Sequence, residues 1–272
     1  MMKLISSCAI VTGGGQGIGL GIAARLLRDG ANVLLFGRTA AKVEAAAETL
    51  NRAAEGRARA LAFAGDVSRA EDVARGVEAA KAAFGLPGIL VNNAGTATLS
   101  AVVDMPEEDF EHVVAVDLKG PFLFMKAVAR ELIAAGKPGA FVNISSLNQQ
   151  AATDGLAHYC AAKAGLAQLS KVTASELGRH GIRVNVVAPG LIRTPLADAV
   201  GLTKGPSAEE FTQRTPLGRI GETDDVAPVV SFLCSEDARW ITGESIFVDG
   251  GNHIRGLHSY LDVLSRGASS AP

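Results

Sequence analysis

A glycine-rich turn between an apolar run and a helical segment most constrains how this chain can fold. The run TGGGQGIG covers residues 12–19 and directly follows the apolar run Cys8–Val11. A glycine turn that leaves a strand and opens a helix lets backbone amides approach a pyrophosphate. The turn therefore predicts a dinucleotide site, in which Gly13 permits the tight turn and Gly17 and Gly19 permit the close approach.

Apolar runs alternate with helical segments along the rest of the chain. Helices are expected from the glycine turn to Arg28, from Thr39, over residues 107–135 and over Tyr159–His180. Continuous apolar strands between helices are typical of a parallel sheet covered on both faces. We expect an α/β fold, namely a single-domain Rossmann-like doubly wound parallel sheet flanked by helices on both faces. The expected strands are Cys8–Val11, Asn32–Phe36, Ala58–Phe63, Ile89–Val91, Ala140–Ile144, Arg183–Ala188 and Ser245–Val248.

Length and charge exclude several classes of protein. The chain has 272 residues, which is enough for one domain with a sizeable core, and its net charge is -2 with no long basic run. No apolar run approaches the roughly 18 residues that a membrane span needs. Three widely spaced cysteines suit a reducing compartment. We therefore expect a cytoplasmic protein that binds neither nucleic acid nor membrane, with one domain over residues 1–266 and a disordered tail over 267–272.

Three residues predict proton transfer chemistry. Tyr159 and Lys163 stand four residues apart in the run YCAAK, so they share one face of a helix. An ordinary tyrosine has a pKa of about 10, and a neighbouring ammonium lowers the cost of its phenolate. Ser146 follows a buried strand, thirteen residues before the tyrosine. The spacing favours a catalytic set of Ser146, Tyr159 and Lys163.

The ordered motifs of the chain resemble those of the short-chain dehydrogenase/reductase family over roughly residues 8–251. The resemblance implies an NAD(P)-dependent oxidoreductase that acts on CH–OH groups (EC 1.1.1.-). It also implies that Ser146 binds the substrate oxygen, that Tyr159 transfers its proton, and that Lys163 binds the nicotinamide ribose and tunes Tyr159. The motifs are TGGGQGIG (12–19), GDV (65–67), NNAG (92–95), NISS (143–146), YCAAK (159–163), NVVAPG (185–190), LIRT (191–194) and VDGG (248–251).

The same resemblance implies which residues bind the cofactor. It assigns contacts with the adenine and its ribose to the GDV and NNAG motifs, and contacts with the carboxamide to Ile192 and Thr194. No metal site is expected, because the spacing of His253 and His258 does not suit ligands on one helical face. The expected cofactor-binding residues are Gly13, Gly15, Gln16, Gly17, Ile18, Gly19, Arg38, Asp66, Val67, Asn93, Ala94, Gly95, Tyr159, Lys163, Pro189, Gly190, Ile192 and Thr194.

The choice of cofactor is expected at the end of the second strand, about 20 residues beyond the glycine turn. An acid there would repel a 2′-phosphate, but the chain has Gly37 and Arg38. A guanidinium pairs well with a phosphate, so NADP(H) is favoured and NAD(H) remains possible. Two observations weaken the preference. Arg38 could stack on adenine or remain solvated, and Gln16 stands where relatives often carry a basic residue.

Asp117 departs from the family pattern. The family has an asparagine in the middle of the long central helix, where it completes the catalytic group and holds a water molecule. The matching residue in VAVDLKGPF is Asp117. An ionised carboxylate accepts hydrogen bonds but cannot donate them. Either Asp117 pairs with Lys163 and takes part in the proton relay, or it only bends or caps the helix.

Two further segments match variable parts of the family. Residues 195–219 are expected to form a substrate loop, and their glycines and prolines predict a mobile lid. Residues 252–266 form a C-terminal extension, which we expect at a subunit interface of a homotetramer, with His253 and Arg255 approaching the neighbour's substrate loop; the resemblance supplies the tetramer. The extension's apolar residues lie close to one helical face: Ile254, Leu257, Tyr260, Leu261 and Leu264.

The substrate itself is not specified by the sequence. Polar residues 148–150 and apolar residues such as Leu99, Leu156 and Leu191 surround the expected pocket. A 3-oxoacyl-thioester reductase-like activity or a small ketone/alcohol dehydrogenase is the first expectation. A sugar, polyol or cyclic alcohol dehydrogenase is the enzymatic alternative. A non-catalytic dinucleotide-binding protein is the alternative from another class, and the intact Ser/Tyr/Lys set argues against it.

Overall fold

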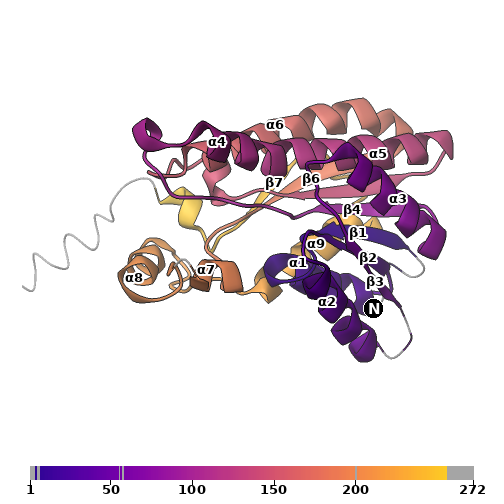
Figure 1. Ribbon diagram of the computed structural model, residues 1–272, viewed down its shortest axis with the longest axis horizontal. Coiled ribbons are helices and arrows are strands. Elements are labelled where there is room, and N and C mark those ends of the chain that lie inside the picture. Colours follow the sequence, from indigo (N-terminus) through magenta and orange to yellow (C-terminus); the bar gives the residue numbers. More distant parts are fainter. Residues whose placement is uncertain (1–3, 5–6, 55, 57, 200, 256–272) are drawn as a thin grey trace, which may run out of the picture.

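In the computed structural model, which describes residues 4, 7–54, 56, 58–199 and 201–255, a seven-stranded parallel sheet lies between two layers of helices (Figure 1). The strand order is β3-β2-β1-β4-β5-β6-β7. This order confirms the predicted doubly wound α/β sheet. The strands are β1 Cys8–Thr12, β2 Asn32–Gly37, β3 Ala60–Ala64, β4 Pro87–Asn92, β5 Gly139–Ile144, β6 Ile182–Pro189 and β7 Ser245–Val248.

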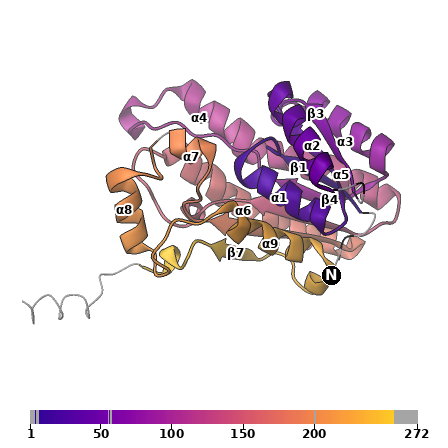
Figure 2. The ribbon, with the colours of Figure 1, turned by 90° about the horizontal axis from the view of Figure 1, so that it is seen from below.

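Each face of the sheet packs against its own helices (Figures 1 and 2). Successive side chains of a strand point to opposite faces, so Ile10 and Leu34 contribute to one buried cluster while Val11 and Leu35 contribute to the other. One layer consists of α1 Gly17–Arg28, α2 Ala40–Ala54 and α9 Thr223–Cys234. The other consists of α3 Ala70–Phe84, α5 Gly120–Ala134 and α6 Ala157–Leu177, with α4 Glu107–Val114 packed against α6.

The structure differs from the sequence-based expectation in the central helix. One helix was expected over residues 107–135, but α4 and α5 are joined by a π-helical segment, η2 Ala115–Lys119. A π segment inserts an extra residue into a helical turn and changes which side chains face inward. Asp117 lies in this segment and is buried.

Helix α9 was not expected from the sequence. It packs closely against α1 and buries Val226, Val230 and Leu233 in the core. Pro228 inside the helix obscures the helical pattern, because proline usually ends a helix. The helix forms because tertiary packing of its apolar face outweighs that local preference.

The expected substrate loop is helical in part. Residues 195–219 contain α7 Pro195–Ala199 and α8 Gly205–Arg214, where the sequence predicted a mobile lid. The start of the C-terminal extension forms a 3₁₀ turn, η6 Asn252–Ile254. The rest of that extension and the predicted disordered tail fall in residues 256–272, outside the described residues. No helix in the described ranges is both long and apolar enough to cross a membrane.

Candidate active site

The glycine turn lies at the C-terminal end of β1, where the strand order reverses between β1 and β4. Ligands of open α/β sheets bind at such reversal points. Gly13 has φ 65, and a Cβ at Gly19 would lie 2.4 Å from both Asn93 Nδ2 and the Gly13 oxygen. These two positions therefore require glycine.

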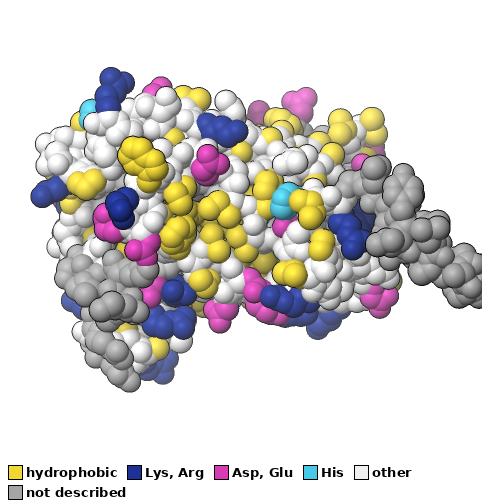
Figure 3. Space-filling model, turned by 180° about the vertical axis from the view of Figure 1, so that it is seen from behind, with side chains coloured by type: hydrophobic (Ala, Val, Ile, Leu, Met, Phe, Trp, Pro, Cys, Tyr) yellow, Lys and Arg dark blue, Asp and Glu magenta, His cyan; other side chains and the backbone are white. Residues whose placement is uncertain are grey.

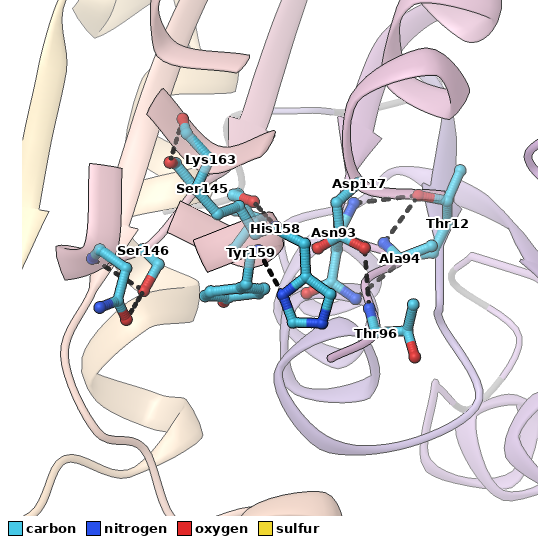
Figure 4. Close-up of polar contacts among 12 residues, drawn as sticks. Thr12, Asn93, Ala94, Thr96, Asp117, Ser145, Ser146, His158, Tyr159 and Lys163 are labelled. Atoms are coloured by element: carbon cyan, nitrogen blue, oxygen red, sulfur yellow. Dashed lines mark hydrogen bonds and ion pairs between the residues drawn. The ribbon is translucent and has the colours of Figure 1, made fainter. Parts of the chain in front are cut away.

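The NNAG motif holds this turn in place (Figure 4). Asn93 Nδ2 donates to the Thr12 carbonyl at 3.0 Å. The Thr12 hydroxyl accepts from the backbone amides of Asn93 at 2.9 Å and Ala94 at 3.0 Å. The side chain and backbone of Asn93 therefore fix the start of the glycine turn by hydrogen bonds to Thr12.

The beginning of α1 suits an anion. Gln16 is its N-cap, no side chain caps the helix, and its first turn contains no acidic residue. The exposed amides and positive dipole of such a helix end attract a phosphate. Gly17 lies beside Thr194, because a Cβ at Gly17 would be 3.4 Å from the Thr194 Cβ, and Gly15 packs against the start of α2. With Ile18 in the first helical turn, this cradle fits the pyrophosphate of a dinucleotide.

The residues expected at the adenine follow β2 and β3. Asp66 accepts hydrogen bonds from the amide of Ser68 at 2.8 Å and from its hydroxyl at 2.7 Å. Burial opposes ionisation of Asp66, but the Ser68 bonds and the charge of Arg38 outweigh it and lower its pKa. Val67 is buried against Gly120, so its side chain belongs to the core. Arg38 is exposed at the end of β2.

Lys42 is a cation that sequence reasoning did not identify. Its ammonium donates to Gln16 Oε1 at 2.9 Å from the first turn of α2. The family's basic residue is absent from the glycine turn, but the fold supplies a charge beside the same position. Lys42 follows Arg38 by four residues, and this spacing is the signal in the sequence that could have indicated a second cation near the glycine turn.

Tyr159 and Lys163 project from α6 beside the end of β5, where Ser146 follows (Figure 4). Lys163 Nζ lies 5.4 Å from the centre of the Tyr159 ring and donates to the Ile144 carbonyl at 3.1 Å. Ser146 Oγ accepts from the amide of Asn148 at 3.1 Å, so it also caps the 3₁₀ turn η3 Leu147–Gln149. Ser146, Tyr159 and Lys163 thus lie around the C-terminal end of β5.

Asp117 forms a buried ion pair with Lys163. Its Oδ2 lies 3.1 Å from Lys163 Nζ, and its Oδ1 accepts from the amide of Thr96 at 2.8 Å. Burial alone would lower the pKa of Lys163, but the charges of Asp117 and Tyr159 together raise it above its ordinary value. Of the two readings left open by the sequence, the structure therefore supports the one in which Asp117 contacts Lys163. Asp117 also lies in the π segment, so the helix is altered there as well.

The PG motif ends β6 at Pro189 and leads back toward the glycine turn. Gly190 packs against Asp249 of the VDGG motif. Ile192 is buried and pairs with Gly221 in an isolated bridge. Thr194 accepts from the amide of Ala197 at 3.2 Å at the start of α7. This segment connects the substrate region with the cofactor cradle.

A cavity of about 530 Å³ lies between α8 and the end of β7. Leu191, Phe211, Phe247 and His253 are among its lining residues. The His253 ring stacks on Phe247 with centroids 4.2 Å apart, and its Nδ1 lies 2.8 Å from Asp249 Oδ2. His253, expected to approach a neighbouring subunit, is thus engaged by its own chain. Within the described ranges, no cluster of three or more potential metal ligands occurs.

Several polar residues of the site were not predicted individually. Thr12 and Thr96 hold the backbone around the glycine turn and Asp117, and the Ser145 hydroxyl donates to the Lys163 carbonyl at 3.1 Å. Thr12 and Ser145 belong to the quoted motifs, so their position was a usable signal. His158 precedes Tyr159 directly and is buried.

Comparison with known proteins gives consistent matches. The family model described as enoyl-(acyl carrier protein) reductase matches residues 13–253. A (3R)-3-hydroxyacyl-CoA dehydrogenase of Rattus norvegicus is 39% identical over 257 residues, with 92% of this chain and 97% of the relative covered. An L-rhamnose 1-dehydrogenase (NAD(P)(+)) of Azotobacter vinelandii is 38% identical over 253 residues, with 92% and 98% covered. The crystal structure of a short-chain type dehydrogenase/reductase from Mycobacterium marinum matches with a TM-score of 0.87 at 30% identity, with 92% and 97% covered.

Proposed function

The chain belongs to the short-chain dehydrogenase/reductase family and is an oxidoreductase that interconverts a secondary alcohol and a carbonyl, and we propose that Ser146, Tyr159 and Lys163 carry this reaction. The observation that carries the proposal is the buried ion pair of Lys163 with Asp117, in which the Lys163 ammonium lies 5.4 Å from the centre of the Tyr159 ring. A nicotinamide cofactor, when bound, supplies or accepts the hydride. The non-catalytic alternative does not explain why these charges are assembled at the sheet edge.

Each residue of the set has a distinct proposed role. Tyr159 transfers a proton to or from the substrate oxygen. Lys163 stabilises the phenolate of Tyr159. Its ammonium donates to the Ile144 carbonyl and forms an ion pair with Asp117, and its remaining donor capacity is proposed to serve a ribose hydroxyl. Ser146 donates its hydroxyl proton to the substrate oxygen in place of Asn148 Oδ1, to which it donates at 3.2 Å.

We propose that NADP(H) is preferred over NAD(H). Arg38 is exposed beyond β2, and Lys42 adds a second cation at the glycine turn. Two cations near one ribose favour a 2′-phosphate by charge. The pyrophosphate would lie on the uncapped start of α1.

For the substrate, we propose a 3-hydroxyacyl or 3-oxoacyl thioester first and a sugar, polyol or cyclic alcohol second. The names of the rat and Azotobacter vinelandii relatives support one choice each, at nearly equal identity. Turnover of acetoacetyl-CoA, L-rhamnose and a cyclic ketone or alcohol, each with both cofactors, discriminates between them. A thioester preference predicts kcat/KM highest for acetoacetyl-CoA, and higher values for rhamnose would favour the second choice.

The proposed mechanism predicts that Tyr159→Phe lowers kcat by about a hundredfold or more, because the proton donor is lost. The fold and the Kd for NADPH should be unchanged, since the ring still packs. Steady-state kinetics on the best substrate, with cofactor fluorescence titration as the control, measures both. Near-normal turnover by this variant would refute the role of Tyr159.

We also propose that the protein is cytoplasmic and forms a homotetramer. Strand β7 lies at the edge of the sheet, and exposed edge strands are usually covered. Hydrophobic side chains are exposed on the face shown in Figure 3. Large exposed hydrophobic residues on the helical layers, such as Phe122 of α5 and Phe232 of α9, are suited to contact other subunits.

A further inference from the structure

His158 is a fully buried residue in the first turn of the helix that carries Tyr159. The amides of a first helical turn have no partner within their own helix. The side chain of the N-cap residue Leu156 makes no capping hydrogen bond. The carbonyl four residues before Tyr159, that of Gly155, accepts from the amide of Ser100 at 3.1 Å. The amide of Tyr159 donates instead to His158 Nδ1 at 2.9 Å (Figure 4).

The other nitrogen of the ring makes a second contact. His158 Nε2 lies 2.9 Å from the hydroxyl oxygen of Thr98. That hydroxyl donates its single proton to Asp109 Oδ2 at 3.0 Å, so its oxygen accepts from Nε2. Nδ1 is therefore an acceptor and Nε2 a donor, which defines one neutral tautomer.

This chain of hydrogen bonds connects three segments of the candidate site. Asp109 belongs to α4, Thr98 to the segment that follows β4, and His158 to α6. The hydrogen bond from the Ser100 amide to the Gly155 carbonyl also joins the segment that follows β4 to the residues just before α6. The position of the Tyr159 backbone thus depends on the segment that begins with the NNAG motif.

We infer that His158 is a positioning residue, which holds Tyr159 in its reactive orientation through Thr98 and Asp109. The inference rests on the proposed role of Tyr159. Reactions that need aligned groups lose rate when one group is displaced slightly. Loss of the hydrogen bonds that join Asp109, Thr98 and His158 should therefore reduce kcat and leave cofactor binding unaltered.

Thr98→Val tests the inference without removing the buried ring, because Thr98 is an exposed residue of the same shape as valine. We expect kcat to fall by about five- to tenfold, with the Kd for NADPH and the unfolding temperature unchanged. Thr98→Ser keeps the hydroxyl and should restore kcat. Equal kcat values for Thr98→Val, Thr98→Ser and the parent protein would overturn the inference.

A spectroscopic measurement tests the same chain independently of turnover. In ¹⁵N-histidine-labelled protein, with the signal assigned by loss in His158→Asn, His158 should be a neutral ring protonated at Nε2. Thr98→Val should broaden or shift that signal. A cationic His158, or a ring protonated at Nδ1, would refute the proposed bonds. Failure of the proposed function differs from both results, since it would appear as an active Tyr159→Phe variant.

Discussion

At the residue scale, the site depends on how a buried ammonium is balanced. Lys163 and Asp117 are 3% and 0% exposed, so each charge needs the other. The raised pKa of Lys163 keeps it charged at neutral pH, although burial alone would have the opposite effect. Because its folded pKa exceeds the ordinary value of 10.5, the stability gained from this charge is present below that pH and is lost as pH rises through the folded pKa.

Asp117→Asn should leave activity intact or raise it, and should move the pH profile. Without the carboxylate, the Tyr159 phenolate becomes the anion that balances the Lys163 ammonium, so this phenolate becomes more stable. The pH of half-maximal alcohol oxidation should therefore fall. Initial rates measured across pH for both proteins test this. A collapse of activity in a folded variant would show that the reaction needs the carboxylate.

Arg38→Ala should weaken NADPH more than NADH by about 1.5–3 kcal/mol, because a charge-assisted contact with the 2′-phosphate is lost. Fluorescence titration of both reduced cofactors measures the difference. Arg52→Ala, which removes an exposed arginine from the last turn of α2, serves as a charge-matched control. Equal weakening of both cofactors would assign Arg38 to adenine stacking.

Gly37→Asp should shift preference further toward NADH, because a carboxylate repels the 2′-phosphate. The structure adds a condition to this test. A Cβ at Gly37 would lie 2.9 Å from the Val43 side chain, so the substitution should be made together with Val43→Ala. The Val43→Ala single variant is the control for its effect on packing.

At the element scale, the start of α9 shows how a helix absent from the sequence-based expectation is stabilised. Glu222 and Asp225 form a reciprocal capping box. Arg219 contacts both oxygens of Asp225 at 2.6 Å and 2.8 Å. These bonds, together with the one from the Glu222 amide, lower the pKa of Asp225 to about 2. The cap directs α9 against α1, beside the cofactor cradle.

Asp225→Ala should lower the free energy of unfolding by about 1–2 kcal/mol, the usual cost of a lost helix cap. Asp225→Asn should cost less, because its amide oxygen can still accept from Glu222. The carboxylate has a folded pKa below its ordinary value of 3.8, so its contribution is present above that pH and is lost as pH falls toward about 2. Denaturant unfolding at neutral pH and near pH 3 should show a smaller difference at acid pH. An equal difference at both pH values would contradict the assignment.

At the scale of the whole molecule, the C-terminal extension contains a part that contacts its own subunit, so the position of a deletion decides what the deletion tests. His253 stacks on Phe247 and contacts Asp249, so deletion after Gly251 would disturb the chain's own cavity. Deletion after Arg255 removes only residues outside the described ranges. The two deletions separate a role in assembly from a role in the subunit.

Deletion after Arg255 should loosen the proposed tetramer or raise KM, because the deleted segment carries the apolar stripe Leu257, Tyr260, Leu261 and Leu264. Light scattering and steady-state kinetics, compared with the full chain, measure both effects. Deletion after Gly251 should add a loss that arises within each subunit. If deletion after Arg255 changed neither the mass of the assembly nor the kinetics, the extension would have no role in a subunit interface.

The sequence by itself determined the parallel sheet and the edge that carries the site. Apolar runs and the glycine turn are local patterns, and they specify the strands and the helices that alternate with them. The carboxyl ends of parallel strands lie at the same edge of a sheet. Gly13, Asn93 and Ser146 follow β1, β4 and β5, which are neighbours in the sheet, so all three stand at its C-terminal edge. The shared face of Tyr159 and Lys163 followed from helical periodicity in the same way.

Only the tertiary structure decided which side chains touch. The bond between Thr98 and His158 joins residues 60 positions apart, and the Asp117–Lys163 pair depends on a π segment that no local pattern announced. Lys42 reaches Gln16 only because α2 packs on the glycine turn. Such contacts depend on the relative placement of whole elements, which is set by close packing across the sheet and not by the residues nearby in sequence.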